Sequence, residues 1–178
     1  MTILDKSFYC KDTVKLAQDL LLKIIHFDGK RIAITETEAY HGYEDKGSHA
    51  YKGRTARNSV MFDTVGHTYI YLIYGMYNMF NITAYQEGFP GAVLIRGGYD
   101  LDSKIYLRGP GIFTKYMKMD RTINNLPLYE QKVIWIEDRK IKPKRINESK
   151  RIGISYAQES QDLLWRFFID ETEIYMIN

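Results

Sequence analysis

The chain has 178 residues, of which 45% are apolar, and its formal net charge is +3. With 15 Tyr, 8 Phe and 2 Trp, it is neither a disordered nor a collagen-like chain, and its length predicts one domain over residues 1–178. The single cysteine, Cys10, excludes an internal disulfide and a cysteine-based zinc site. No apolar run approaches the roughly 20 residues of a membrane span, and the first residues lack a secretory pattern. We therefore expect a cytoplasmic protein that is not secreted and has no membrane partner.

The first part of the chain predicts a helix followed by a hairpin. Asp12 precedes a helical pattern and predicts an N-capped helix over residues 12–23. Residues 24–27 and 31–40 are rich in β-forming side chains, and Asp28-Gly29 between them predicts a tight turn. Residues 41–67 are polar and predict a long loop with a short helical piece, and loops of this length are usually functional.

A second hairpin is predicted by strands over 67–74 and 77–85, because glycine at the first central position of Gly75-Met76 suits a type II′ turn. Further strands are expected over 92–96, 133–137, 152–155 and 167–169, and a helix over 109–117. Together these elements predict an α+β fold with a curved, largely antiparallel, open-barrel-like sheet, flanking helices and a protruding β-hairpin.

Basic side chains concentrate in residues 139–151, which hold seven positive side chains and one negative side chain. Such a stripe on a neutral body is typical of a surface that binds a polyanion, and it is equally compatible with a solvated loop. Arg54, Arg57 and Asn58 lie in a second stretch, GRTARN, that could hold phosphates or form a polar loop.

Glu36 and Glu38 lie two residues apart on one predicted strand and share a face with Tyr40. A pair of carboxylates can act as general acid and base at a glycosidic bond, or can simply face solvent. The histidine spacings match no zinc signature, and no phosphate-binding glycine motif is present, so we expect neither a metal nor a cofactor.

On the second hairpin, Tyr69, Tyr71 and Ile73 share one face of the strand. An aromatic surface with basic neighbours suits the stacking of bases, although an aromatic core is an alternative explanation. Tyr74 adjoins the turn, where there is little core to bury it, and is better explained as a contact residue.

Several motifs, in the same order and spacing, closely resemble the alkyladenine (3-methyladenine) DNA glycosylase family over nearly the whole chain. These are ETEAY (36–40), GRTARN (53–58), YIYLIYGMY (69–77), VLIR (93–96), RGPG (108–111) and RIGI (151–154). The resemblance implies a monomer that flips alkylated or deaminated purines out of double-stranded DNA and hydrolyses the N-glycosidic bond. A bacterial member would work at the nucleoid. No lysine in the matched motifs suits a Schiff base, so strand cleavage is not expected.

The resemblance also implies roles for single residues. Glu38 matches the residue that activates the attacking water, and Arg96 matches one that holds Glu38 and that water. A main-chain carbonyl near Ile152 would complete the catalytic site. Tyr40 and Tyr71 match the residues that sandwich the flipped base.

The remaining implied roles concern base selection and DNA contacts. His49 matches a residue that hydrogen-bonds the base, and Asn81 matches one that screens against normal guanine. Tyr74 matches a side chain that enters the minor groove and fills the vacated stack. Arg54, Arg57 and Asn58 are expected at the DNA backbone.

The chain departs from the family pattern at Val65-Gly66, Phe80, Gly97-Gly98 and Ile112. Phe80 and Gly97-Gly98 are the departures expected to bear on substrate range, and Ile112 replaces a frequent lysine at the DNA backbone. Two other functions stay open: a glycoside hydrolase that uses Glu36 and Glu38, and a nucleic-acid-binding module without catalysis.

Overall fold

The computed structural model describes residues 2–177. Its strands are β1 (Thr2–Ile3), β2 (Ile24–Phe27), β3 (Lys30–His41), β4 (Thr68–Ile73), β5 (Tyr77–Thr83), β6 (Gly91–Asp100), β7 (Tyr106–Arg108), β8 (Ile134–Asp138), β9 (Asn147–Ser149) and β10 (Arg166–Phe168). The α-helices are α1 (Lys6–Tyr9), α2 (Thr13–Asp19), α3 (Ser59–Asp63) and α4 (Pro110–Met117). The 3-10 helices are η1 (Arg121–Ile123), η2 (Gln158–Asp162) and η3 (Glu171–Met176).

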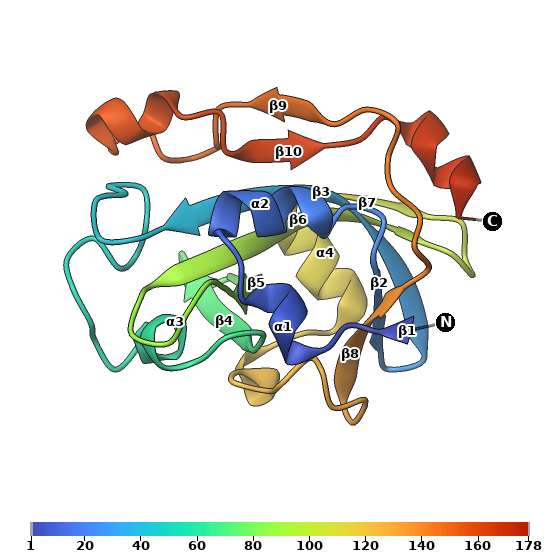
Figure 1. The fold of residues 1–178 in the computed structure, drawn as a ribbon, viewed down its shortest axis with the longest axis horizontal. Coiled ribbons are helices and arrows are strands. Elements are labelled where there is room, and N and C mark those ends of the chain that lie inside the picture. The colour runs from blue at the N-terminus through green and yellow to red at the C-terminus, as the bar shows by residue number, and fades with distance from the viewer. Residues whose placement is uncertain (1, 178) are drawn as a thin grey trace.

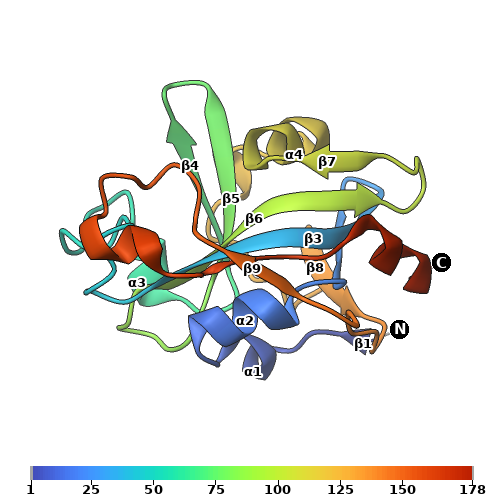
Figure 2. The same cartoon turned by 90° about the horizontal axis from the view of Figure 1, so that it is seen from above.

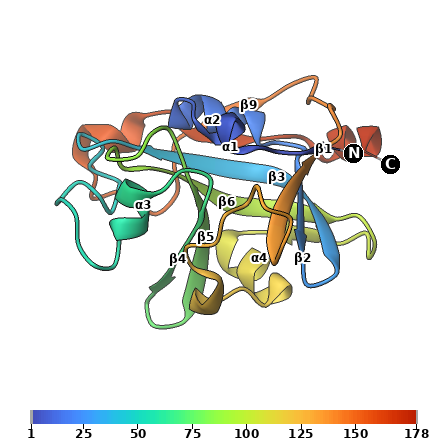
Figure 3. The same ribbon diagram turned by 60° about the horizontal axis from the view of Figure 1, so that its bottom comes forward.

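All ten strands belong to one curled sheet in which every pairing is antiparallel (Figure 1). Its main path runs β1-β8-β2-β3-β6-β5-β4. The long strand β3 pairs with β6 along most of its length and with β2 and then β10. Helices α1 and α2 lie on one side of β3 and β6 and α4 on the other (Figure 3), which confirms the predicted fold class.

Helix α2 begins as predicted. The Asp12 side chain accepts hydrogen bonds from the backbone N–H groups of Val14 and Lys15 and thereby caps α2. The helix ends at Asp19 rather than near residue 23, because the chain turns through Leu22, at φ +65°, into β2.

The β2–β3 hairpin is confirmed, and its turn residues Asp28 and Gly29 both have positive φ, as a type I′ turn requires. The turn predicted for the second hairpin is wrong. A type II′ turn has two central residues with positive φ at the first, here Gly75, whereas Ile73 pairs with Tyr77 across a three-residue loop in which both Tyr74 and Gly75 have positive φ. The hairpin itself projects from the sheet (Figure 2).

Strand β6 is longer than the predicted 92–96 and runs through Gly97-Gly98. A Cβ atom on Gly98 would collide with Ile32 of β3 and with the ring of Phe113 on α4. These glycines therefore let a strand and a helix approach β6 closely, which gives this departure from the family pattern a packing role.

The last third of the chain agrees with the sequence only in part. The strands expected over 133–137 and 167–169 are confirmed as β8 and β10, each within one residue. The strand expected over 152–155 is wrong, because these residues form an irregular loop. Strands β7 and β9 were not expected. No described helix is long and apolar enough to cross a membrane.

Candidate active site

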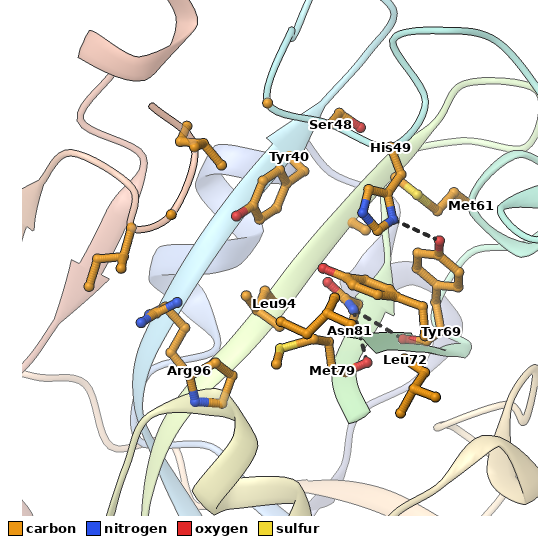
Figure 4. A pocket seen from close by; sticks show the side chains of 18 of the residues that line it. Tyr40, Ser48, His49, Met61, Tyr69, Leu72, Met79, Asn81, Leu94 and Arg96 are labelled. Atoms are coloured by element: carbon orange, nitrogen blue, oxygen red, sulfur yellow. Dashed lines mark hydrogen bonds between the residues drawn. The ribbon is translucent and has the colours of Figure 1, made fainter. Parts of the chain in front are cut away.

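A cavity of about 560 Å³ opens between the β4–β5 hairpin, the end of β3 and the loop that follows β9. It is lined by all four residues predicted for the base pocket, which are Tyr40, His49, Tyr71 and Asn81. Arg96 lines it as well. Figure 4 shows Tyr40, His49, Asn81 and Arg96 around the same space. The structure thus brings together residues from β3, β4, β5, β6 and the loop after β3, while their roles stay predictions.

Glu38 lies in β3, next to the cavity, and its side chain is fully buried. One carboxylate oxygen, Oε1, accepts a hydrogen bond of 2.8 Å from the backbone N–H of Ile152. The other, Oε2, accepts one of 2.8 Å from the hydroxyl of Tyr40. Arg96 Nε lies 3.5 Å from Oε1. The carboxylate is therefore fixed by a neighbour on its own strand and by two segments distant in sequence. The group of Ile152 that contacts it is the N–H; the carbonyl expected from the resemblance is not tested.

Glu36 has a different environment from Glu38. Its Oε1 accepts hydrogen bonds from Nε of Arg96, at 3.0 Å, and from Nε of Arg166, at 2.6 Å. Arg96 therefore bridges the two carboxylates and lies closer to Glu36. Glu36 accepts hydrogen bonds from two guanidinium groups, and neither Glu36 nor Glu38 is among the residues that line the cavity. The two therefore do not form a pair of free carboxylates on either side of a sugar.

Burial raises the pKa of Glu38 above its ordinary value, and the nearby negative charge of Glu36 acts in the same direction. The charge of Arg96 and the hydrogen bonds from Ile152 and Tyr40 oppose this increase in the pKa. Burial also raises the pKa of Tyr40 well above its ordinary value, so this phenol stays protonated and donates a hydrogen bond to Glu38. The site thus holds one carboxylate with enhanced basicity.

The opposite wall of the cavity is aromatic. The ring of His49 meets that of Tyr71 edge-on, with 4.2 Å between the ring centroids. His49 Nδ1 and the Tyr69 hydroxyl are hydrogen-bonded at 3.3 Å. Desolvation by its neighbours lowers the pKa of His49, as does the positive charge of Arg57, although the residue is exposed at the rim. Burial raises the pKa of Tyr69 to about 12. The wall therefore presents neutral side chains at pH 7.

Asn81 is buried, and its amide nitrogen donates to the backbone carbonyls of Tyr69 and Met79, each at 3.2 Å. These bonds hold the side chain in one orientation. The adjacent Phe80 points the other way, into the core, where it stacks on Phe113. Phe80 does not line the cavity, so this departure from the family pattern has no direct contact with the pocket.

The three residues expected at the DNA backbone have separate environments. Arg54 is exposed and forms a two-pronged ion pair with Asp63. Arg57 lies at the cavity, donates to the backbone carbonyl of Leu72 at 2.6 Å, and has its guanidinium 5.8 Å from the ring centroid of Tyr71.

Asn58 is buried, and its amide nitrogen donates to the carbonyls of His49 and Gly53. These contacts order the loop around Asn58, and its expected role at the DNA backbone stays a prediction. Of the three residues, only Arg57 lies at the cavity.

Sequence reasoning missed the buried ion pair between Arg151 and Asp45 beneath the cavity. Arg151 was counted among the cations of the basic segment, but its side chain is fully buried. Nothing in the charge pattern distinguishes it from its exposed neighbours; only its position in the RIGI motif sets it apart. In the part of the chain that the structure describes, no cluster of three or more His, Cys, Asp or Glu could hold a metal ion.

Comparison with known proteins shows clear similarity along the whole chain. The family model of methylpurine-DNA glycosylase (MPG) matches residues 7–173. A protein of Rickettsia felis is 37% identical over 172 residues, which cover 96% of this chain and 95% of that protein. One of Methanocella arvoryzae is 38% identical over 186 residues, with 94% and 92% covered. One of Clostridium acetobutylicum is 38% identical over 190 residues, with 92% of each covered. All three are provisionally named 3-methyladenine DNA glycosylase.

The raised pKa of Glu38 predicts how the stability of the protein depends on pH. A carboxyl group whose pKa rises on folding holds its proton more tightly in the folded chain. Its ionisation therefore costs stability as pH rises from the ordinary glutamate pKa through the folded one. We expect Glu38→Gln to melt at a higher temperature than the unchanged protein at about pH 8, and the difference to shrink toward about pH 4.

Thermal unfolding of both proteins across this pH range checks the prediction. Glu44→Gln is a matched control, because Glu44 is exposed in the loop after β3 and should show no such trend. If Glu38→Gln were less stable than the unchanged protein at the higher pH and equal at the lower, the attractive contacts of Glu38 would outweigh its burial.

Proposed function

Since this chain belongs to the methylpurine-DNA glycosylase family, we propose that it removes alkylated and deaminated purines from double-stranded DNA by hydrolysing the N-glycosidic bond. The observation that carries the proposal is a single buried carboxylate, Glu38, next to an aromatic cavity and held in place on both oxygens. We propose that it acts as a monomer, because the carboxylate, the cavity walls and the hairpin tip of a single copy suffice for this reaction.

In the proposed reaction, Glu38 takes a proton from a water molecule, whose oxygen forms a bond to C1′ of the deoxyribose. The N-glycosidic bond breaks, and its electron pair leaves with the purine. A purine alkylated at N3 or N7 carries a positive charge, so it departs as a neutral base without further protonation. One general base is then sufficient, and its raised pKa makes it a better proton acceptor near neutral pH. A neutral lesion such as hypoxanthine needs an additional proton.

For the flipped base, we propose the space between Tyr40 and Tyr71. Tyrosine faces attract a cationic purine by roughly 0.5–2 kcal/mol, and a damaged base costs less to unstack than a normal one. The neutral His49 at the rim supplies a hydrogen bond to the base. The fixed amide of Asn81 crowds the 2-amino group of a normal guanine.

Tyr74 is the residue that we propose fills the gap left by the flipped nucleotide. It is 87% exposed at the hairpin tip, where its φ of +49° is unfavourable for a residue with a side chain. Met76 at this tip is also exposed, as is Ile112 of α4, whose neighbour Gly111 approaches Tyr77 of the hairpin. An apolar surface is therefore available to the minor groove.

The strand that carries the lesion would continue over a second cavity of about 590 Å³. This cavity adjoins the first, because His49, Tyr69 and Arg57 line both. Lys52 adds positive charge, whereas Lys46 is paired with Glu159, and none of the described residues that line the cavity is acidic. Basic groups beside aromatic faces suit phosphates and unstacked bases.

This path differs from the one that the basic segment 139–151 suggested. The chain between β8 and β9 lies away from the β4–β5 hairpin in both Figure 1 and Figure 2, and Arg151 is buried. We therefore propose that the exposed cations of this segment contribute less to DNA affinity than Lys52 and Arg57.

Replacing the proposed general base tests the reaction. Glu38→Gln should release 3-methyladenine from methylated duplex DNA about 10²–10⁴-fold more slowly than the unchanged protein, because the amide accepts no proton from water. Single-turnover assays measure this rate. Glu36→Gln is the informative comparison: an effect as severe as that of Glu38→Gln would favour a paired-carboxylate hydrolase. Unaltered release by Glu38→Gln would refute the proposed mechanism. DNA binding with no release by any of the proteins would favour a binding module.

Removing the exposed aromatic side chain tests the proposed wedge. Tyr74→Ala should weaken binding to lesion-containing and undamaged duplexes alike, with little change in melting temperature, because an exposed side chain contributes little to the core. Fluorescence anisotropy and thermal unfolding measure the two quantities. A large loss of thermal stability with unaltered DNA affinity would assign Tyr74 to the fold.

Salt dependence tests the proposed DNA path. Each phosphate contact contributes about −0.9 to the slope of log K against log salt concentration, so Lys52→Gln should reduce the steepness by about one. The matched control is Lys140→Gln, in the basic segment, which should leave the slope unaltered. The reverse pattern would place DNA on the basic segment instead.

A further inference from the structure

Besides Glu38, two further charged side chains near the cavity are fully inaccessible, those of Arg151 and Asp45. The two oxygens of Asp45 accept from the two terminal nitrogens of Arg151 at 2.6 and 2.7 Å. The same nitrogens also donate to the backbone carbonyls of Ala39 and Ser160, each at 3.0 Å. The guanidinium is therefore held in one position by four hydrogen bonds.

This ion pair joins the segments that build the cavity. Ala39 lies between Glu38 and Tyr40 on β3, and Ser160 lies in η2. Asp45 itself accepts from the backbone N–H groups of His41 and Gly47 and so orders the loop that leads to His49. Removing either charge would release this loop and the segment after β9 together.

Arg151 is also linked to the proposed catalytic residue through its neighbour in the sequence. The residue after it is Ile152, whose N–H donates to Glu38. The guanidinium lies 4.8 Å from the ring centroid of Tyr40 and 5.1 Å from that of Trp165, so it packs against one of the proposed base-stacking rings. One rigid side chain thus sets the position of a hydrogen-bond donor to the carboxylate and of an aromatic wall.

Stability alone gives a weak reason for such a pair, since removing two charges from water costs about as much as their attraction returns, and apolar pairs often replace buried ion pairs without loss. The pair lies instead where geometry matters, between Glu38 and the loop that carries His49.

We propose that Arg151, fixed by Asp45, is a positioning residue that holds the Ile152 N–H on Glu38 and the Tyr40 ring at the base pocket. This inference rests on the proposed function for its catalytic consequence. Its structural consequence, the state of the Glu38 carboxylate, can be measured without any DNA.

Several charged or titratable groups besides the Ile152 N–H influence the pKa of Glu38. Glu36 and Tyr40 face it from β3, Arg96 from β6 and Tyr71 from β4, while Arg166 of β10 acts through Glu36. The Ile152 N–H bond stabilises the ionised carboxylate. If that donor moves away, Glu38 holds its proton to a higher pH and acts as a base only at that higher pH.

Two variants test the proposal. Arg151→Lys keeps the charge but loses the planar, two-pronged grip on Asp45, and Asp45→Asn removes the charge of the partner. Both should lower the single-turnover rate of 3-methyladenine release, by about 10²-fold for a displacement near 1 Å. The acidic limb of the pH–rate profile should move to higher pH, and the double variant should lose less than the product of the single effects. Arg139→Lys is the control, because Arg139 pairs with Glu137 away from the cavity.

An NMR titration of the Glu38 side-chain carboxyl in the DNA-free proteins gives a readout independent of activity. The proposal predicts a higher Glu38 pKa in both variants than in the unchanged protein, and an unaltered one in Arg139→Lys. A folded Arg151→Lys or Asp45→Asn protein with an unaltered Glu38 pKa would overturn it, as would a rate loss without a shift of the acidic limb. If the unchanged protein released no base while the Glu38 pKa rose in the variants, the proposed function would fail and the positioning role would stand.

Discussion

The hydrogen bond from the Ile152 N–H to Glu38 is the contact on which the architecture of the site depends. A carboxylate whose side chain is buried in the middle of a sheet strand needs donors nearby to remain ionisable. Here a backbone N–H after β9 and a phenol two residues away donate hydrogen bonds to it, and a guanidinium on β6 lies 3.5 Å from it. The curled sheet brings β3 and β6 together, and the pairing of β10 with β3 returns the C-terminal segment to the same place. The fold thus produces one basic carboxylate next to an open aromatic cavity.

The site divides its polar groups between an inner and an outer set. The inner set, Glu38 with Arg96, Glu36 and the Arg151–Asp45 pair, is closely hydrogen-bonded and buried except for the half-buried Glu36. The outer set of Arg57, His49 and Tyr74 is exposed at the rim and the hairpin tip. The inner set holds the proposed base in a fixed position. The outer set faces the solvent, where DNA would enter and leave. The left-handed backbone at Tyr74 belongs to the outer set, and the local strain is compatible with a contact role.

The sequence predicted what local chemistry determines. The Asp12 cap, the Asp28-Gly29 turn and the Gly-Pro start of α4 each depend on neighbours within a few residues, and all three form. Predictions that depend on distant partners were less successful. Residues 152–155 have β-forming side chains but form no strand, since the N–H of Ile152 binds Glu38 instead. The resemblance identified the pocket residues, because the family motifs mark side chains that lie together in the fold although they are distant in the sequence. Charge counting misplaced Arg151, because its partner Asp45 is more than a hundred positions away in the sequence.

The central claim is that Glu38, with a pKa raised by burial, is the group whose ionisation permits base release. The most direct test compares two measurements on the unchanged protein: the Glu38 carboxyl pKa from an NMR titration, and the acidic limb of the pH profile for single-turnover release of a cationic alkylated purine. The DNA complex of an uncleavable lesion analogue is the appropriate sample for the titration. We predict that the two values coincide and lie above the ordinary glutamate pKa. A Glu38 that titrates at or below its ordinary value, while the rate depends on a group of different pKa, would contradict the account.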